Sequence, residues 1–421
     1  MVASRFINFI FVLDAVFLLF YSPTIAAEGM KLDLEKAIKL ALEQNLELKA
    51  KEAELGLAKG QITKANLFLQ HNPELDVDLA HRGAKKKEEG ERRYHTDVEV
   101  KLSQEIEIGG QSTYRREAAQ KELEKATWEL RETGQQVRFR VKSLFFTLLT
   151  LQEKMERGKA TVGLLDRLLD AAKNRVRVGD APEMILAQAE FELSRAKSDI
   201  LGLKREYVSN LAELRVVLSL PPEQEVTLEG RLKKKVSLPD LKALLESALR
   251  NRPDLAVRDA ERQVAEAEVN LTRSERIPNP EFSVFYSREE GNFNIFGGGV
   301  SIPLPFFDRK QGELEQALAR KSIADIEYRN LRQTVEKNLR SAWERYRISE
   351  AEIDLFGENV LGKFRENLEL TQRAYEEGQI EIFEAITAQD RLIEAQVRYF
   401  DVLLAFHLAR AELEREAALE Q

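Results

Sequence analysis

Two stretches of this chain change from a helical to a strand-like spacing of hydrophobic residues at the same tripeptide. Asn72-Pro73-Glu74 follows a segment whose apolar residues recur every three to four positions, and it precedes a segment in which apolar and charged residues alternate. The tripeptide recurs as Asn279-Pro280-Glu281 between segments of the same two kinds. Proline cannot continue a helix and moves its predecessor out of the α region, so each copy predicts a helix followed by a strand.

The similarity of the two copies extends well beyond the tripeptide. A constant offset of 207 positions relates nine more residues to identical ones in the second copy: Asp33, Leu34, Ala41, Leu42, Leu48, Ala53, Glu54, Ala58 and Val77. An offset of 199 relates four later residues to identical ones: Gly179, Ala189, Leu193 and Ala196. We therefore predict a tandem duplication, with a first structural repeat at 28–219, a connector at 220–238 and a second repeat at 239–421.

Each repeat is predicted to contain one β-hairpin with an apolar and a polar face. In the first hairpin, about 74–108, the apolar positions that alternate with polar ones are Leu75, Val77, Leu79, Val98, Val100, Leu102, Ile106 and Ile108. In the second hairpin, about 281–304, they are Phe282, Val284, Tyr286, Phe296, Val300, Ile302 and Leu304. This alternation is typical of strands with one face in an apolar environment.

The rest of the chain has a helical period. Short helices are predicted at 32–44, 46–70, 239–251 and 254–276, and a short strand at 226–228. Long helices are predicted at 111–178, 183–218, 310–377 and from 382 to the end, with turns at 179–182 and 378–379. A helix of about 67 residues extends roughly 100 Å. Helices of that length must pack on one another, so the fold class is mainly α with a small β part.

The faces of the four predicted strands indicate a membrane environment. A polar interior and an apolar exterior describe a transmembrane barrel strand. Four strands cannot close a barrel, and an open sheet edge is not tolerated in lipid. Closure therefore requires several copies of the chain: two copies give eight strands, and three give twelve and room for an aqueous lumen. The alternative is a pair of soluble hairpins on a helical protein.

Composition and targeting features narrow the class of protein. The formal net charge of −8 argues against nucleic acid as a partner, and the absence of cysteine excludes disulfides and thiolate metal sites. Residues 1–27 have the features of a signal peptide: Arg5, an apolar run from Phe6 to Phe20, and Ala26-Ala27. A signal anchor is the alternative. No later segment reaches the ~18 apolar residues of a membrane helix, so an exported protein is predicted.

Taken together, several motifs resemble the TolC-like outer membrane efflux family. They are the two Asn-Pro-Glu tripeptides, the segment from Ala248 to Leu255, Leu102-Ser103-Gln104 with Gly109-Gly110, and the turns at Gly179 and Gly378. The resemblance runs from Leu32 onward. It implies a homotrimer with a twelve-stranded barrel in outer-membrane lipid and a long periplasmic α-helical tube. The segment Glu107-Ile108-Gly109-Gly110-Gln111 resembles the branch that serves heavy-metal cation efflux.

The resemblance also implies a site at the helical turns far from the membrane. In that family these turns form a constricted entrance at which a periplasmic adaptor docks, with an aromatic residue before one turn and two acids beyond it. The candidate residues are Gly179, Asp180, Glu183, Tyr375, Glu377, Gly378, Glu381 and Glu384. Tyr375 and Glu384 match the aromatic and the first acid, whereas Thr387 and Ile380 occupy the positions of the second acid and its basic partner. The acids form either a cation-attracting ring or ordinary solvated charges near helix ends.

Other constellations carry no chemistry that the sequence identifies. The spacing of the four histidines, His71, His81, His95 and His407, matches no catalytic zinc pattern. Gly297-Gly298-Gly299 is not a phosphate loop, since no lysine or helix follows, and in a strand it allows a bend or a close neighbour. No nucleophile with a base is evident. We predict no enzyme activity, no cofactor and no metal site.

The predicted function is therefore a passive outer-membrane conduit of a tripartite efflux system. It would work with a periplasmic adaptor and an inner-membrane pump, of the RND type as the resemblance implies. A soluble periplasmic coiled-coil scaffold without a barrel is the alternative. The sequence leaves open whether the substrate is a metal cation, a drug or a secreted protein.

Overall fold

The computed structural model describes residues 30–85, 92–232, 239–289, 293–355 and 382–419, with shorter stretches between 362 and 380. The predicted signal peptide at 1–27 lies outside these residues. The described chain divides into two compact units. The first consists of Met1–Glu43, Arg140–Lys234 and Phe356–Leu404, and the second of Gln44–Phe139, Lys235–Leu355 and Ala405–Gln421. The long helix α4 (Gln111–Arg177) contributes to both units.

The first unit is built from long helices and a small parallel sheet. It contains β1 (Met30–Leu32), most of α2 (Leu34–Gln44), α5 (Glu183–Val217), β4 (Val226–Leu228) and the first part of α10 (Ile382–Glu416). β1 pairs with β4 in parallel, from Met30 opposite Val226 to Leu32 opposite Leu228. The strand predicted at 226–228 is confirmed, whereas the strand at 30–32 was not predicted.

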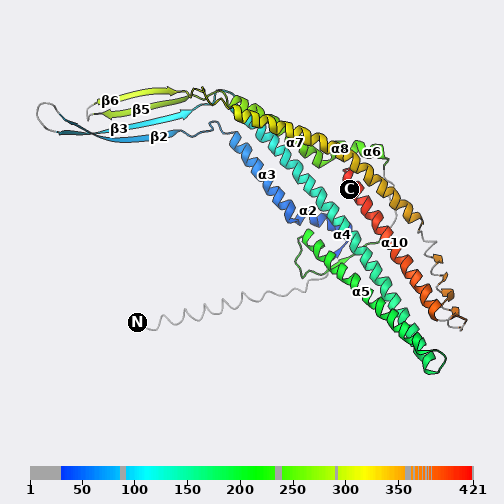
Figure 1. The fold of residues 1–421 in the computed structure, drawn as a ribbon. Coiled ribbons are helices and arrows are strands. Elements are labelled where there is room, and N and C mark those ends of the chain that lie inside the picture. Colours follow the sequence, from blue (N-terminus) through cyan, green and yellow to red (C-terminus); the bar gives the residue numbers. More distant parts are fainter. Residues whose placement is uncertain are drawn as a thin grey trace, which may run out of the picture. The chain divides into compact units, whose positions relative to one another are not determined.

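The second unit contains the four-stranded sheet and the helices that lead into it. Its helices are α3 (Leu46–Ala65), α6 (Leu241–Asn251), α7 (Pro253–Ser274) and α8 (Gln311–Leu355). Its strands are β2 (Glu74–Lys85), β3 (Arg92–Glu105), β5 (Glu281–Glu289) and β6 (Phe293–Ser301), in the spatial order β2-β3-β5-β6. All neighbours are antiparallel, as Figure 1 shows. The β3–β5 pairing therefore joins the two predicted hairpins into one sheet.

The helices begin where the sequence places capping residues. The side chain of Asn45 accepts hydrogen bonds from the backbone N–H of Glu47 (2.9 Å) and Leu48 (3.1 Å) at the start of α3. Asp240 caps α6 through the Ala243 N–H (3.0 Å), and Pro253 occupies the first turn of α7. These contacts satisfy backbone donors that have no partner within the helix. The predicted helices at 111–178, 183–218, 239–251 and 254–276 are confirmed to within two residues.

Four predicted boundaries are wrong. The last helix, α10, ends at Glu416 and does not run to the end of the chain. α3 ends at Ala65 with Asn66 as its C-cap, not at 70. β3 ends at Glu105, so Ile106 and Ile108 lie beyond the strand. β6 ends at Ser301, which leaves Ile302 and Leu304 outside it. Prolines at 303 and 305 explain the last case, because proline has no N–H to donate to a neighbouring strand.

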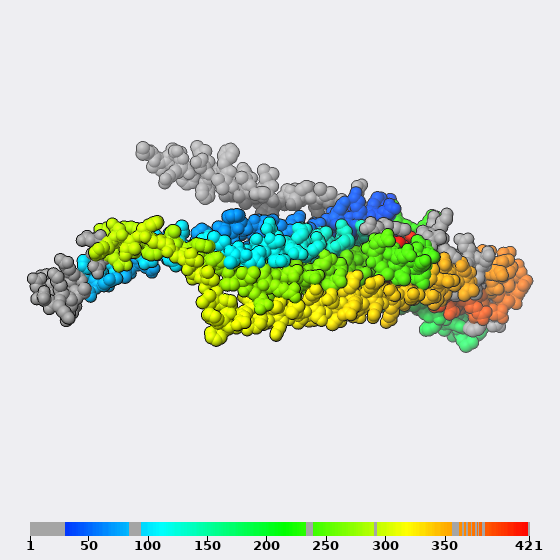
Figure 2. All heavy atoms as spheres, turned by 90° about the horizontal axis from the view of Figure 1, so that it is seen from above, coloured from blue at the N-terminus to red at the C-terminus, as the bar shows by residue number. Residues whose placement is uncertain are grey.

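The core of the second unit lies between helices. α7 and α8 lie side by side (Figure 2), and α8 also packs against the last part of α10. Val335, Leu339 and Ala342 of α8 are fully buried, and the rings of Tyr346 and Phe406 have their centroids 5.4 Å apart. These α8 residues belong to the apolar row that the helical period predicts, so burial of that row against other helices stabilises the unit.

Candidate channel surfaces and the strand–helix junctions

One face of the four-stranded sheet is apolar and exposed in the single chain. The register places Val77, Val100, Tyr286 and Phe296 in one row across all four strands. Leu75, Leu102 and Val284 form the next row. Phe296 is 81% exposed, and the other side chains named here, except the half-buried Val100, are exposed as well. A contiguous apolar face of this kind on a protein surface marks contact with lipid or with another protein.

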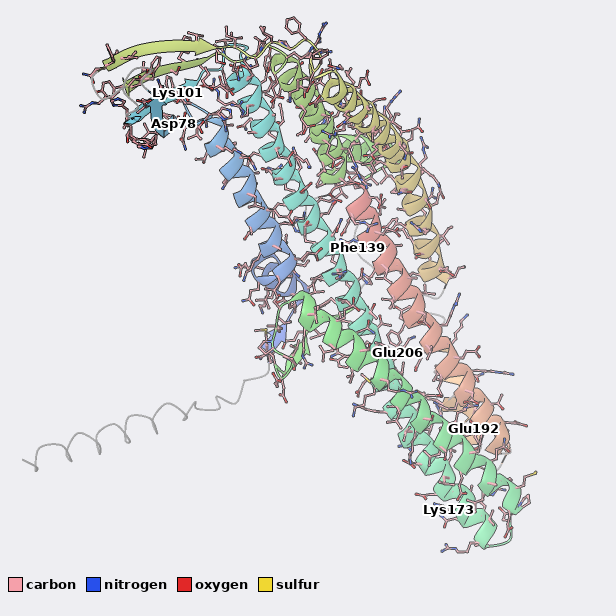
Figure 3. The ribbon with its side chains drawn as sticks, turned by 60° about the vertical axis from the view of Figure 1, so that its left-hand side comes forward. Asp78, Lys101, Phe139, Lys173, Glu192 and Glu206 are labelled. Carbon is pink, nitrogen blue, oxygen red and sulfur yellow. The ribbon has the colours of Figure 1, made fainter. Side chains whose placement is uncertain are left out.

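The opposite face of the sheet is polar and mostly acidic. Lys101 of β3 lies 4.0 Å from the Asp76 carboxylate on β2 and 3.8 Å from the Glu281 carboxylate on β5. Figure 3 shows Asp78 and Lys101 on these neighbouring strands. Asp97 is buried and its carboxylate lies 3.1 Å from Arg82. The division into an apolar and a polar face, predicted from the alternation, is therefore found across β2 and β3, whereas Phe285 and Ile295 bring apolar side chains to the polar face in β5 and β6.

The glycine run in β6 makes room for a ring on the polar face. Phe285 of β5 lies opposite Gly297, and a Cβ atom at 297 would lie 2.5 Å from Cζ of that ring. No side chain can occupy that space unless the ring moves. The expectation that these glycines allow a close neighbour is confirmed at Gly297.

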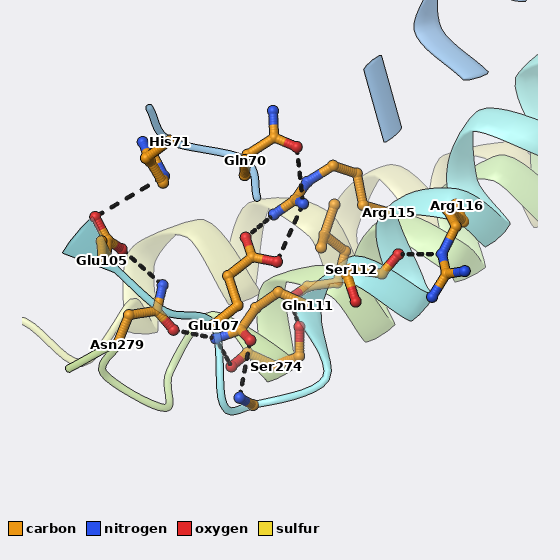
Figure 4. Close-up of polar contacts among 12 residues, drawn as sticks. Gln70, His71, Glu105, Glu107, Gln111, Ser112, Arg115, Arg116, Ser274 and Asn279 are labelled. Carbon is orange, nitrogen blue, oxygen red and sulfur yellow. Dashed lines mark hydrogen bonds and ion pairs between the residues drawn. The ribbon is translucent and has the colours of Figure 1, made fainter. Parts of the chain in front are cut away.

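The β3–α4 junction, residues 106–111, is held to the end of α7 by one glutamine. Gln111 is the first residue of α4 and is only 2% exposed. Its Nε2 lies within hydrogen-bonding distance of three acceptors: the Ser274 carbonyl (3.3 Å), the Ile277 carbonyl (3.2 Å) and Oδ1 of Asn279 (2.9 Å). Its Oε1 accepts from the backbone N–H of Gly109 (2.9 Å). Figure 4 shows this network, which connects the two predicted repeats.

Glycine is required beside Gln111 for two reasons. Gly110 has a φ of 75°, which favours glycine, and it directly precedes α4. A Cβ atom on Gly109 would lie 2.7 Å from the Ser274 carbonyl oxygen, so the close approach of α7 depends on its absence. The Gly-Gly-Gln motif that supports the family resemblance is thus explained by packing at this junction.

An ion pair holds the outer side of the same junction. The guanidinium of Arg115, one turn into α4, forms a bidentate pair with the Glu107 carboxylate. It also donates to Oε1 of Gln70, which follows the end of α3, at 3.0 Å. Asn279 donates to Oε1 of Glu105 at 2.8 Å. Sequence reasoning did not identify these contacts: the Gln70–Arg115 and Glu105–Asn279 contacts join distant segments, and the Glu107–Arg115 pair crosses the junction between a strand and a helix.

The structure describes five of the eight residues predicted at the helical turns. Gly179 ends α4 with a φ of 79°, and Asp180 is paired with Arg175 (Oδ2 to Nε, 2.9 Å). Glu183 and Glu384 are exposed in the first turns of α5 and α10, and Glu377 is exposed and accepts from Gln379 (2.7 Å). Tyr375, Gly378 and Glu381 lie outside the described residues.

The turn region of the first unit has a shared apolar core. Leu165, Leu168, Leu169 and Ala172 of α4 pack with residues of both α5 and α10, namely Ala189, Leu193, Ala385 and Ile386. Ile380, beside the second turn, is half-buried against this core.

A charged groove of about 1370 Å³ lies between α4, α5 and α10 of the first unit. Arg195 of α5 bridges Glu192 (2.8 Å) on its own helix and Asp390 (2.9 Å) on α10. Lys154 of α4 pairs with Asp401 of α10 at 2.6 Å. Figure 3 shows Glu192 and Glu206 on α5. The two sides of the groove are thus linked by ion pairs between helices.

No helix in the described part of the chain combines the length and the apolar character needed to cross a membrane. In the same residues, no three His, Asp or Glu side chains are grouped so as to hold a metal ion.

Comparison with known proteins places the fold and the family. The model of the outer membrane efflux protein family matches residues 37–219 and 244–418. The cobalt-zinc-cadmium resistance protein CzcC of Cupriavidus metallidurans is 28% identical over 385 residues, which cover 91% of this chain and 89% of CzcC.

Solved structures give the same fold. The structure of CusC has a TM-score of 0.75 at 16% identity and covers 92% of each chain. The CmeC outer membrane channel of Campylobacter jejuni has a TM-score of 0.77 at 17% identity, over 91% of this chain and 85% of CmeC.

These comparisons confirm an outer-membrane efflux channel component with a mainly helical fold and a smaller β part, and they give no support to a soluble scaffold. The family consists of transport components rather than enzymes. The chain belongs to the outer membrane efflux protein family.

Proposed function

We propose that three copies of this chain form one duct across the outer membrane. The observation that supports it is the four-stranded sheet, whose apolar face is exposed and whose outer strands, β2 and β6, each have one neighbour in the described chain. An open edge is not tolerated in lipid, so further copies must pair with it. Three copies provide twelve strands and an aqueous lumen. The polar face then lines the lumen, and the apolar face meets lipid.

The duct is proposed to export divalent heavy-metal cations. CzcC, the relative that aligns with nine-tenths of the chain, is a cobalt-zinc-cadmium resistance protein. The predicted lumen face carries an excess of carboxylates. By register, Lys101, Arg82 and Arg93 share this face of β2, β3 and β5 with the acids Glu74, Asp76, Asp78, Asp97, Glu99, Glu105 and Glu281. A lumen of negative potential raises the local concentration of cations without binding them at a defined site.

The partners proposed are a periplasmic adaptor and an inner-membrane pump of the RND type. The adaptor would dock at the helical turns, formed by Gly179, Asp180, Glu183, Tyr375, Glu377, Gly378, Glu381 and Glu384. Exposure of Glu183, Glu377 and Glu384 supports this assignment. Asp180 contributes less free charge to an acidic ring, because Arg175 pairs with it. We also propose that residues 1–27 are removed on export and that the repeats at 28–219 and 239–421 are joined by 220–238.

The experiment uses two adjacent residues on opposite faces of β2. Val77 is on the apolar face and Asp78 on the polar face. A strain lacking the protein should lose resistance to cobalt, zinc and cadmium, and the wild-type chain should restore it. Val77→Lys should fail to restore it and should give few heat-modifiable trimers in the outer membrane, since a lysine at the lipid midplane costs about 2–4 kcal/mol. Asp78→Lys should still assemble into trimers.

The outcomes separate the parts of the proposal. Equal assembly of the Val77→Lys and Asp78→Lys variants would contradict the assignment of faces. Normal metal resistance in the deletion strain, with increased sensitivity to organic drugs, would refute the metal substrate and leave the duct. A purified wild-type chain that remains a single copy in detergent would refute the trimer.

A further inference from the structure

The two places where a strand leads into a long helix share one local geometry. Gly110 (φ 75°) precedes Gln111 at the start of α4, and Lys310 (φ 57°) precedes Gln311 at the start of α8. In both, the glutamine Oε1 accepts from the backbone N–H two residues earlier, at 2.9 Å from Gly109 and 2.7 Å from Arg309. Gln311 in the β6–α8 junction, residues 302–311, therefore has the same local backbone setting as Gln111 in the β3–α4 junction.

Among the described residues, the β3–α4 junction binds a helix end and the β6–α8 junction does not. Gln111 is buried against the end of α7, where Nε2 reaches Ser274, Ile277 and Asn279. Gln311 is exposed, and its Nε2 donates to the Phe307 carbonyl four residues earlier at 3.2 Å. The same side chain in the same local setting thus contacts another repeat in one case and its own loop in the other.

The duplication identifies the helix end that would be equivalent, for Gln311, to the end of α7 that Gln111 binds. The offset of 207 that relates the two Asn-Pro-Glu tripeptides places Leu67, Gln70 and Asn72 at the positions of Ser274, Ile277 and Asn279. These residues follow α3, which ends at Ala65 as α7 ends at Ser274. Ser274 is buried and Asn279 half-buried, whereas Leu67 and Asn72 are exposed. The end of α3 is therefore an equivalent surface that is exposed at Leu67 and Asn72 in the single chain, with the Gln70 side chain half-buried and bound by Arg115.

Apolar exposure flanks both uncovered surfaces. Phe68, beside the end of α3, is 96% exposed, and Phe307, in the β6–α8 junction, is 94% exposed. Two aromatic side chains this exposed, each beside an edge strand of the sheet, mark surfaces that contact another chain. The outer strands agree, since Val77 of β2 and Phe296 of β6 lie on the same face and pairing these edges keeps that face continuous.

We infer that Gln311 is an intersubunit clamp. It binds the end of α3 of the partner subunit, with the carbonyl groups of Leu67 and Gln70 of the partner subunit and the side chain of Asn72 of the partner subunit as acceptors. The interaction repeats between subunits what Gln111 does within one, and it rests on the proposed trimer. Each subunit then supplies one clamp and receives one, so the ring of junctions closes.

The clamp between subunits differs from the internal one in one respect. Arg309 stands where Gly109 stands in the β3–α4 junction. Since a Cβ at 109 would lie 2.7 Å from the Ser274 carbonyl oxygen, the helix end of the partner must lie further from the backbone at 309. The Arg309 guanidinium donates to the Pro305 carbonyl (3.3 Å) and has further N–H groups, which suit the carbonyl end of a helix.

Engineered cysteines test the clamp cleanly, because the chain has no native cysteine. The chain carrying Asn72→Cys and Gln311→Cys is assembled in membranes and treated with a bis-maleimide of short spacer. We expect covalent dimers and trimers on a denaturing gel. The matched control carries Asn279→Cys and Gln111→Cys, the internal equivalents, and should give cross-linked monomer. Each single-cysteine chain should give no covalent dimer.

A second variant tests the contact of Gln311 with the partner subunit without a cross-link. Gln311→Ala should leave helix content unchanged and should accelerate heat dissociation of the trimer roughly tenfold, as expected for the loss of one or two hydrogen bonds. The clamp would be overturned if native trimers of the Asn72→Cys, Gln311→Cys chain gave only monomer after cross-linking, or if trimers of the Gln311→Ala variant dissociated at the wild-type rate. Either result would leave the proposed trimer intact. Absence of trimers from the wild-type preparation would instead refute the proposed function.

Discussion

A buried histidine near the C-terminal end of α10 makes the stability of the protein depend on pH. His407 is 5% exposed, and its ring lies against that of Phe406, with centroids 5.5 Å apart. Burial lowers the pKa of His407 from 6.5 to about 4, with a further lowering by the nearby Arg410 and an opposing effect of Glu414. The folded protein therefore holds this ring neutral at pH values where an exposed histidine is protonated.

The direction and size of the effect follow from that difference in pKa. Between pH 6.5 and about 4 the unfolded chain binds more protons at His407 than the folded chain does, so stability falls as the pH falls. Above pH 6.5 the ring is neutral in both states and the contribution is fully present. Between pH 7.5 and 5.0, the linkage relation gives a loss of about 2 kcal/mol from this one group.

The assay compares the wild type with two variants that cannot titrate at this position. His407→Leu fills the site with an apolar side chain, and His407→Gln keeps a polar one. Unfolding of the solubilised full chain by urea, followed by circular dichroism at 222 nm, gives the free energy of unfolding at pH 7.5 and 5.0. The wild type should lose about 2 kcal/mol more than either variant over this interval.

The comparison isolates His407 because the carboxylates of the chain titrate in all three proteins. The reasoning is refuted if both variants lose as much stability between pH 7.5 and 5.0 as the wild type. A result in which His407→Gln keeps the wild-type pH dependence and His407→Leu loses it would also contradict a titration of the ring. The structure predicts that both variants lack the extra loss of about 2 kcal/mol that the wild type shows between pH 7.5 and 5.0.

Two further predictions concern a buried ion pair and the helical turns. Arg252→Met should destabilise the second unit by about 3–5 kcal/mol in the same unfolding assay, because Glu416, 6% exposed and 2.5 Å from the guanidinium, would keep only its pair with Arg415, and Asp254 would lose its partner as well. Adding Glu416→Leu should recover much of that loss, and Lys321→Met at an exposed pair should cost less than about 1 kcal/mol. Tyr375→Ala with Glu384→Ala should raise single-channel conductance in planar bilayers by widening the proposed entrance, and unchanged conductance would remove both from the gate.

The local pattern of the sequence predicted most of the elements. Periodicity and capping residues located α5, α6 and α7 to within two residues at each end, and they located the strand at 226–228. Alternation located the faces of the sheet, because side chains in a strand point to opposite sides in turn whatever the tertiary context. The strand ends were wrong at Ile106 and Ile302. The alternation continues through Ile106, whose N–H still donates to the Pro280 carbonyl (2.9 Å), and through Ile302, which follows the last paired residue, Ser301.

Contacts between distant segments could not be predicted in this way. The β3–β5 pairing and the Gln111 network connect residues more than 160 positions apart, and no local periodicity encodes a partner at that distance. Asp180 shows the same limit within a turn: its charge suggested an open acidic ring, whereas the structure pairs it with Arg175. The Gly-Gly-Gln motif could be recognised as a family resemblance from the sequence. The reason for it, the close approach of the Ser274 carbonyl to Gly109, is seen only in the structure.

The duplication gives the most direct physical argument for assembly. A chain with two copies of a strand–helix junction and two copies of a helix end can satisfy one pairing internally, and here β3–α4 binds the end of α7. The other junction and the other helix end then remain at opposite edges of the sheet, because β6 and β2 are its outer strands. They cannot meet within one copy without closing a four-stranded barrel, which is too small to enclose its own side chains. A neighbouring copy is therefore the natural partner, and the internal junction is the template for the contact between subunits.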